Sequence, residues 1–147
     1  MSFKKVMCAA LATVLVGAFA ASASASDKKM SINLGHVAIE TTPIGRGTEY
    51  FAQIVNEKTN GRITVSVFPN SQLGGNREMI EQLQMGTLQF CSPSNAFLGG
   101  FTDKTALFDL PYLFTSEEGA FKVFDSEVGT AILDDLEGAG IKGLGWF

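Results

Sequence analysis

The feature that most constrains the fold is an alternation of β-branched runs with helical patterns. The run Ile63–Phe68 consists of β-branched and aromatic residues apart from Ser66, and it stops at Pro69, which predicts a strand. Before it, residues 43–59 repeat apolar side chains at helical spacing, between a Thr-Pro start and an Asn-Gly stop. A strand that is preceded and followed by helices belongs to an α/β fold.

The same signals extend along the chain after residue 30. The predicted order is a strand at 32–37, a helix at 43–59, a strand at 63–68, a helix that Asn76 caps and Gly86 closes, a strand at 88–91, a mixed stretch, helices after Ser116 and Ser126, and a strand at 141–147. Strands joined through helices pair in parallel with right-handed crossovers. Sheets of this kind bind ligands beyond the carboxyl ends of their strands, so that edge is where we expect a site.

The first 25 residues predict export. Lys4 and Lys5 precede an uncharged apolar run, and the small residues after it allow cleavage following Ala25 or Ala23. We therefore expect residues 1–25 to be a signal peptide and the mature chain to begin near residue 26. An uncleaved anchor is the alternative, but the run is short for a membrane span, which needs about 20 residues.

Charge and composition exclude several classes of function. Loss of Lys4 and Lys5 would leave nine basic residues against 15 acidic ones, which argues against nucleic acid and anionic membrane surfaces as partners. The mature chain has a single histidine, His36, and a single cysteine, Cys91, so we expect no metal site. Phosphate-binding glycine loops and a nucleophile elbow are missing as well. No catalytic residue and no cofactor is predicted.

Five segments, taken together and in this order, resemble the solute receptors of tripartite ATP-independent periplasmic (TRAP) transporters. They are Leu34-Gly35-His36-Val37 with Thr42-Pro43, residues 50–65, residues 67–75 (Val-Phe-Pro-Asn-Ser-Gln-Leu-Gly-Gly), residues 81–88 (Glu-Gln-Leu-Gln-Met-Gly-Thr-Leu), and residues 108–114 (Phe-Asp-Leu-Pro-Tyr-Leu-Phe). Each segment alone is a weak signal, but all five cover essentially the whole mature chain.

The resemblance implies a two-lobed periplasmic receptor that closes on a small organic acid and delivers it to a TRAP permease driven by an ion gradient. Residues 26–147 would form the first lobe, a type II periplasmic-binding-protein lobe with a mostly parallel sheet flanked by helices. The resemblance also implies no enzymatic activity, no membrane insertion after signal cleavage, and a carboxylate-binding arginine in a second lobe. Since the chain stops within an apolar run at Phe147, we expect it to be truncated before that lobe.

The candidate solute contacts of the first lobe lie in two loops. His36, Thr41 and Thr42 follow the first predicted strand, where hydroxyls beside helix N–H groups suit a carboxylate oxygen. The second loop offers Ser94, Asn95 and Phe97. Other roles stay open, because Thr42 can act as a helix cap alone, His36 can be a polar residue at a strand end, and Phe97 can belong to the core.

Two arginines are further candidates for binding an anion, and three other functions are alternatives to a TRAP receptor. Arg46 and Arg77 lie in first helical turns and are expected to be solvated or paired with Glu49 and Glu81, so they are left out of the predicted site. The other functions are a receptor for an ATP-driven importer, the sensing domain of a signalling protein, and a secreted hydrolase whose catalytic residues follow Phe147.

Overall fold

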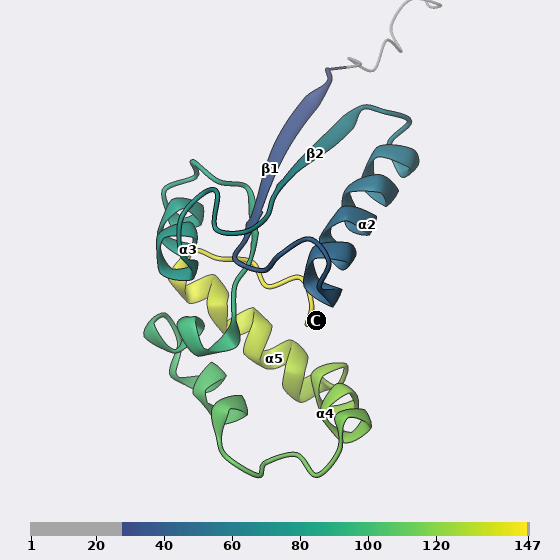
Figure 1. Ribbon diagram of the computed structural model, residues 1–147. Coiled ribbons are helices and arrows are strands. Elements are labelled where there is room, and N and C mark those ends of the chain that lie inside the picture. The colour runs from purple at the N-terminus through teal and green to yellow at the C-terminus, as the bar shows by residue number, and fades with distance from the viewer. Residues whose placement is uncertain (1–27, 147) are drawn as a thin grey trace, which may run out of the picture.

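The computed structural model describes residues 28–146, so the predicted signal peptide at 1–25 lies outside the described residues (Figure 1). The chain begins as an α/β unit of alternating strands and helices. In order, these elements are β1 (Met30–His36), α2 (Pro43–Lys58), β2 (Ile63–Phe68), α3 (Asn76–Gln84) and β3 (Phe90–Ser92).

The three strands form a parallel sheet in the order β2-β1-β3. Leu34 of β1 lies opposite Val67 of β2 and Phe90 of β3, and this register brings the ends of all three strands to one edge. The prediction of an α/β fold with a parallel sheet flanked by helices is confirmed.

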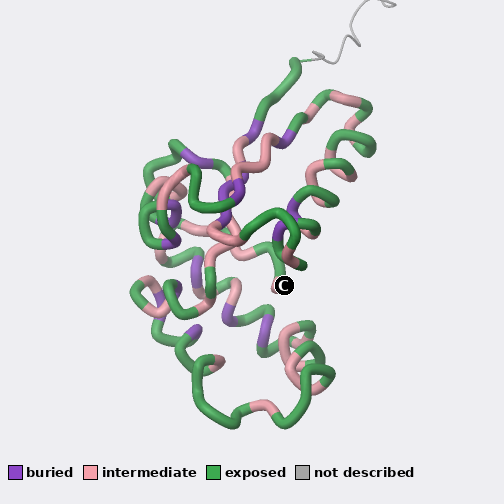
Figure 2. The backbone as a smooth tube through the Cα atoms, viewed as in Figure 1, coloured by how far each residue is buried: buried purple, intermediate pink, exposed green. Residues whose placement is uncertain are grey.

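Helices cover both faces of this sheet, as Figure 1 shows with α2 on one side of β1 and β2 and α3 on the other. Under α2, Phe51 and Val55 pack against a core of Ile32, Leu34 and Val65. On the opposite face, Ile80 of α3 forms a second core with Leu98 and Leu136. The buried residues accordingly gather along the strands and the inner sides of the helices (Figure 2).

The local sequence determines where α2 starts and how closely it packs on the loop after β1. Thr42 caps the helix, because its hydroxyl oxygen accepts a hydrogen bond from the Gly45 N–H at 3.2 Å, and Pro43 occupies the first helical position. Gly45 packs directly on the preceding loop, where a Cβ would lie 2.5 Å from the Glu40 carbonyl oxygen. Glycine is therefore required for the loop and the helix to approach this closely.

The remainder of the chain is less regular. It consists of the 3₁₀ segments η1 (Asn95–Gly100), η2 (Asp103–Asp109) and η3 (Leu136–Ala139) and the helices α4 (Glu117–Phe124) and α5 (Glu127–Asp135). Ser116 and Ser126 cap α4 and α5 as predicted. An aromatic cluster holds this part together, and its members are Phe108, Phe114, Phe121, Phe124 and Trp146.

Several predicted boundaries differ from the structure, beginning with the first strand, which is Met30–His36 instead of 32–37. Asn76 is the first residue of α3, and Gly75 takes the cap position. The third strand is Phe90–Ser92 instead of 88–91, although Leu88 is buried. Residues 141–146 have no regular secondary structure and pair with no described strand, so the predicted strand at 141–147 is wrong over these residues. Strand formation needs a neighbour with free backbone groups, which a β-like sequence alone does not supply.

Candidate functional site

The candidate site is the carboxyl edge of the sheet, where β1, β2 and β3 end at His36, Phe68 and Ser92. The loops that follow β1 and β2 are joined there by main-chain hydrogen bonds. The Asn70 N–H donates to the Ala38 carbonyl oxygen at 2.9 Å, and the Ser71 N–H donates to the His36 carbonyl oxygen at 3.1 Å. The two predicted contact loops, which follow β1 and β3, emerge at this same edge because β1 and β3 pair in parallel.

His36 is buried at this edge, with 1 % of its surface exposed. Neither ring nitrogen has a hydrogen-bond partner within the described residues, although the Ala38 backbone lies near the ring. Burial lowers the pKa of the imidazole, and the Ala38 backbone and the Glu49 carboxylate oppose this shift only in part. His36 is thus an uncharged side chain beneath the β1–α2 loop, and its contact with a solute stays a prediction.

The hydroxyl groups of Thr41 and Thr42 differ in exposure and in the hydrogen bonds that they already make. The Thr42 hydroxyl donates to the Ile39 carbonyl oxygen at 2.7 Å while its oxygen accepts from Gly45, so it is engaged as a cap. Thr41 is exposed at the start of α2. Of this pair, Thr41 is the side chain that is accessible to a solute.

The loop after β3 contains an exposed Ser94 and a half-buried Asn95. The Asn95 side-chain amide donates to the Thr105 carbonyl oxygen and to Asp109 Oδ1, both at 3.0 Å, so it joins η1 to η2. Its Oδ1 is buried without a partner in the described chain. Phe97 is 48 % exposed and lies outside the core.

Sequence reasoning missed Asn76 as a member of this edge. Its side chain is 92 % buried, and Asn76 Oδ1 accepts a hydrogen bond from the Ser94 N–H at 3.3 Å. The sequence signal was a polar residue after Gly74-Gly75, which we interpreted as a helix cap. The partner lies 18 residues away, so only the folded chain reveals this second role.

Neither arginine near the edge is directed into it as an anion ligand. Arg77 is exposed and its Nε lies 3.0 Å from Glu81 Oε1, which is the pairing expected from the sequence. Arg46 is exposed at the start of α2 and lines a groove together with the carboxylates of Glu40 and Glu49. The predicted residues of the edge are therefore uncharged hydrogen-bonding groups and one aromatic ring. No cluster of three metal-binding side chains occurs among residues 28–146.

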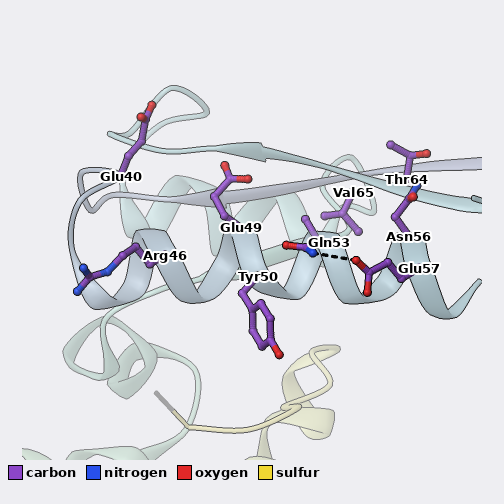
Figure 3. Close-up of a pocket in the computed structure, with 10 residues that line it drawn as sticks. Glu40, Arg46, Glu49, Tyr50, Gln53, Asn56, Glu57, Thr64 and Val65 are labelled. Carbon is purple, nitrogen blue, oxygen red and sulfur yellow. Dashed lines mark hydrogen bonds between the residues drawn. The ribbon is translucent and has the colours of Figure 1, made fainter.

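A groove of about 630 Å³ runs between α2 and β2, and Glu40 of the loop after β1 is one of its lining residues (Figure 3). Three of its lining side chains are Glu40, Glu49 and Glu57, and Arg46 points away from Glu49. Gln53 Nε2 donates to Glu57 Oε1 at 2.8 Å. Three carboxylates make this groove unfavourable for an organic anion, because like charges repel.

A second, apolar cavity of about 770 Å³ lies beside β3. Its walls come from both helical layers, through Phe51 and Ile80, and from the irregular residues 140–146. Cys91 also lines it, and burial raises the pKa of this thiol to about 12. Because the thiol stays protonated at neutral pH, Cys91 behaves as a small apolar side chain, as predicted.

The fold is an α/β unit whose parallel strands end at one edge, and comparison with known proteins identifies its family. Residues 34–147 match the family model described as bacterial extracellular solute-binding protein, family 7. The chain belongs to this family. The resemblance to receptors of TRAP transporters is thereby confirmed.

Similar proteins are known both from sequence and from solved structures. The C4-dicarboxylate-binding periplasmic protein DctP of Rhodobacter capsulatus is 40% identical over 90% of this chain and 41% of its own length. The C4-dicarboxylate-binding protein DctB of Bacillus subtilis is 40% identical over 76% of this chain and 32% of its own length. A TRAP solute-binding protein from Sulfurospirillum deleyianum, solved with succinate, aligns with a TM-score of 0.72 at 38% identity, covering 76% of this chain and 36% of that one.

The coverage values show how much of each relative this chain matches. The chain spans about a third to two-fifths of the length of these relatives. Within residues 28–146, the structure contains no helix with the length and apolar character of a membrane span.

Proposed function

We propose that the complete protein is an extracytoplasmic receptor that binds a small organic acid and delivers it to a TRAP-type permease. The observation that carries this proposal is the carboxyl edge, where two loops of a family 7 fold present hydroxyl and amide groups beside helix N-termini. Such groups bind carboxylate and hydroxyl oxygens. In this proposal residues 1–25 direct export to the periplasm and residues 26–147 are the first lobe.

The ligands of related structures support the chemical class of the solute. The protein from Sulfurospirillum deleyianum was solved with succinate, one from Pseudomonas aeruginosa with L-malate, and one from Advenella mimigardefordensis with galactonate. All three ligands carry a carboxylate. We infer a solute of this class, held on the first lobe by Thr41, Ser94 and Phe97, which are the exposed members of the predicted set.

The predicted first-lobe contacts carry no positive charge, so we propose that the carboxylate of the solute is bound by the rest of the protein. The predicted contacts of the first lobe are uncharged, and burial lowers the pKa of His36, which keeps this side chain neutral. The anionic group of the solute is therefore expected to meet a cation on the second lobe, which is the arginine that the resemblance implies. In this proposal the solute is bound and released without chemical change, and the solute-binding proteins among the relatives of this chain support that part of it.

Isothermal titration calorimetry on the protein from the complete coding sequence tests this proposal. Succinate, L-malate and galactonate are the probes, and at least one is expected to bind and to be recovered unchanged by mass spectrometry. Ser94→Ala is expected to weaken binding about two- to tenfold, the worth of one hydrogen bond. Thr130→Ala, at an exposed position on α5, is the matched control. Absence of binding by all three acids, or recovery of an altered product, would contradict the proposal.

Delivery to a permease needs a separate measurement. The receptor and its permease, reconstituted in vesicles, are expected to accumulate the acid when an ion gradient is imposed, without ATP. Uptake that needs ATP would instead identify a receptor of an ATP-driven importer.

A further inference from the structure

The three loops of the carboxyl edge are held together by two different kinds of hydrogen bond. Main-chain bonds from Asn70 and Ser71 join the loop after β2 to the loop after β1. The loop after β3 is instead tied to α3 through a side chain, by the bond between the Ser94 N–H and Asn76 Oδ1. Loss of one side chain therefore removes this connection, whereas the bonds between the first pair of loops do not depend on any side chain.

Asn76 is held in one place by its surroundings. It lies in the first turn of α3, and only 8 % of its surface is exposed. The same turn is closed by the Gly75 N–H, which donates to Glu78 Oε2 at 2.9 Å. A buried side chain on an anchored helical turn has little rotational freedom left, so its oxygen is a fixed acceptor for the Ser94 N–H.

Ser94 has its backbone fixed and its side chain free. It follows Pro93 and has an extended backbone, with φ −69° and ψ 140°. Within the described chain its hydroxyl takes part in no hydrogen bond, whereas its N–H is bound by Asn76. The neighbouring Asn95 then secures the other side of the loop by its bonds to Thr105 and Asp109.

From this geometry we infer that Asn76 is a positioning residue of the solute site, which acts by holding Ser94 at the carboxyl edge. This inference rests on the proposed function for its effect on affinity. Its structural part, that Asn76 fixes the Ser94 loop before any solute arrives, does not depend on that proposal. A purely structural role as the first residue of α3 would change the stability of the helix and leave the loop and the solute affinity unchanged.

The structural part is tested by NMR on the protein from the complete coding sequence, without any solute. In Asn76→Ala the amide proton of Ser94 is expected to shift upfield and to exchange with solvent faster. Asn76→Asp keeps an oxygen acceptor, so the Ser94 amide proton is expected to stay hydrogen-bonded, with no upfield shift and slow exchange with solvent. Asn56→Ala, an asparagine on α2 far from this edge, is the matched control. An unchanged Ser94 amide in Asn76→Ala overturns the inference, whatever the protein binds.

The functional part is tested by a double-mutant cycle in calorimetry, with succinate and L-malate as probes. Asn76→Ala is expected to lower affinity about two- to tenfold. Combined with Ser94→Ala, it is expected to add little further loss, because both changes remove the same contact. Fully additive losses, or a lowered melting temperature at unchanged affinity, would overturn the inference. If the parent protein binds neither acid while the Ser94 amide responds, the proposed function fails and the structural inference stands.

Discussion

The two parts of the described chain differ in how they are held together. Residues 28–92 form a parallel sheet with a helix against each face, and their core contains β-branched and aliphatic side chains. Residues 93–146 contain no strand and depend on short helices and on the aromatic cluster around Phe124 and Trp146. The two parts meet in one shared core, where Ile80 contacts Leu98 and Leu136.

This contrast separates two sources of rigidity. The first part is fixed by ladders of main-chain hydrogen bonds, which any sequence of suitable shape can form. The second part is fixed by side chains, such as the edge-to-face and stacked rings around Phe124 and the Trp146 Nε1–H bond to the Gly129 carbonyl oxygen at 3.3 Å. We therefore expect the second part to respond more locally to substitution than the first.

The shared core offers the largest expected effect. Ile80 is fully buried, and Ile80→Ala is expected to lower the free energy of unfolding by about 2–5 kcal/mol, because it leaves a cavity between the two parts. Chemical denaturation followed by circular dichroism measures the loss, and hydrogen exchange should show faster opening in both parts. Faster exchange confined to residues 28–92 would contradict a shared core.

A smaller and more local loss is expected in the aromatic cluster. Phe124 contacts four other aromatic rings but is only half-buried, so Phe124→Ala is expected to cost about 1–3 kcal/mol. Hydrogen exchange should accelerate in α4 and α5, while β1 and β2 keep their protection. Phe97→Ala, at an exposed ring, is the control and should change little. Equal loss of protection in the sheet would show that the two parts are one cooperative unit.

The helix caps allow a matched comparison of the two parts. Thr42→Ala removes the acceptor for the Gly45 N–H and is expected to cost about 1 kcal/mol. Ser116→Ala removes the equivalent acceptor at α4, where the Ser116 hydroxyl binds the Gly119 N–H at 3.1 Å. Because α4 has no fully buried residue, fraying should remain local there, and the melting temperature should fall less than in Thr42→Ala. A larger fall in melting temperature for Ser116→Ala than for Thr42→Ala would contradict the expectation that the second part responds more locally to substitution.

A finer test uses pH. The pKa of His36 is lowered by burial from its usual 6.5, so the unfolded chain binds a proton more readily, and the free energy of unfolding should fall as pH drops below about 6.5. His36→Met removes the titrating group and should flatten melting temperature against pH between pH 5 and 7.5. Asp135, whose pKa is lowered by hydrogen bonds from Lys104 and Thr102, titrates below 3.8, outside this window. An unchanged slope in His36→Met would show that another group is responsible.

The sequence predicted best what depends on near neighbours. The strand Ile63–Phe68 and the start of α2 at Pro43 matched the structure, because β-branched runs and Thr-Pro caps act over a few residues. The strand predicted at 141–147 was wrong over 141–146, because a strand also needs a partner. At the site, the two loops were predicted from the strand topology together with the family resemblance, and their contact with a solute stays a prediction. Other features of the site could not be predicted, because they depend on residues distant in sequence. These features are the burial of His36, the bonds of Asn95 to Thr105 and Asp109, and the bond from the Ser94 N–H to Asn76.

The bond between Asn76 and Ser94 has a consequence for how such receptors diversify. Asn76 Oδ1 accepts its hydrogen bond from the main-chain N–H of residue 94, and every amino acid except proline has this N–H. A single codon change there can alter the shape or charge that a solute meets while the loop keeps its course. New solute preferences are then reachable one mutation at a time, without passing through variants that misfold.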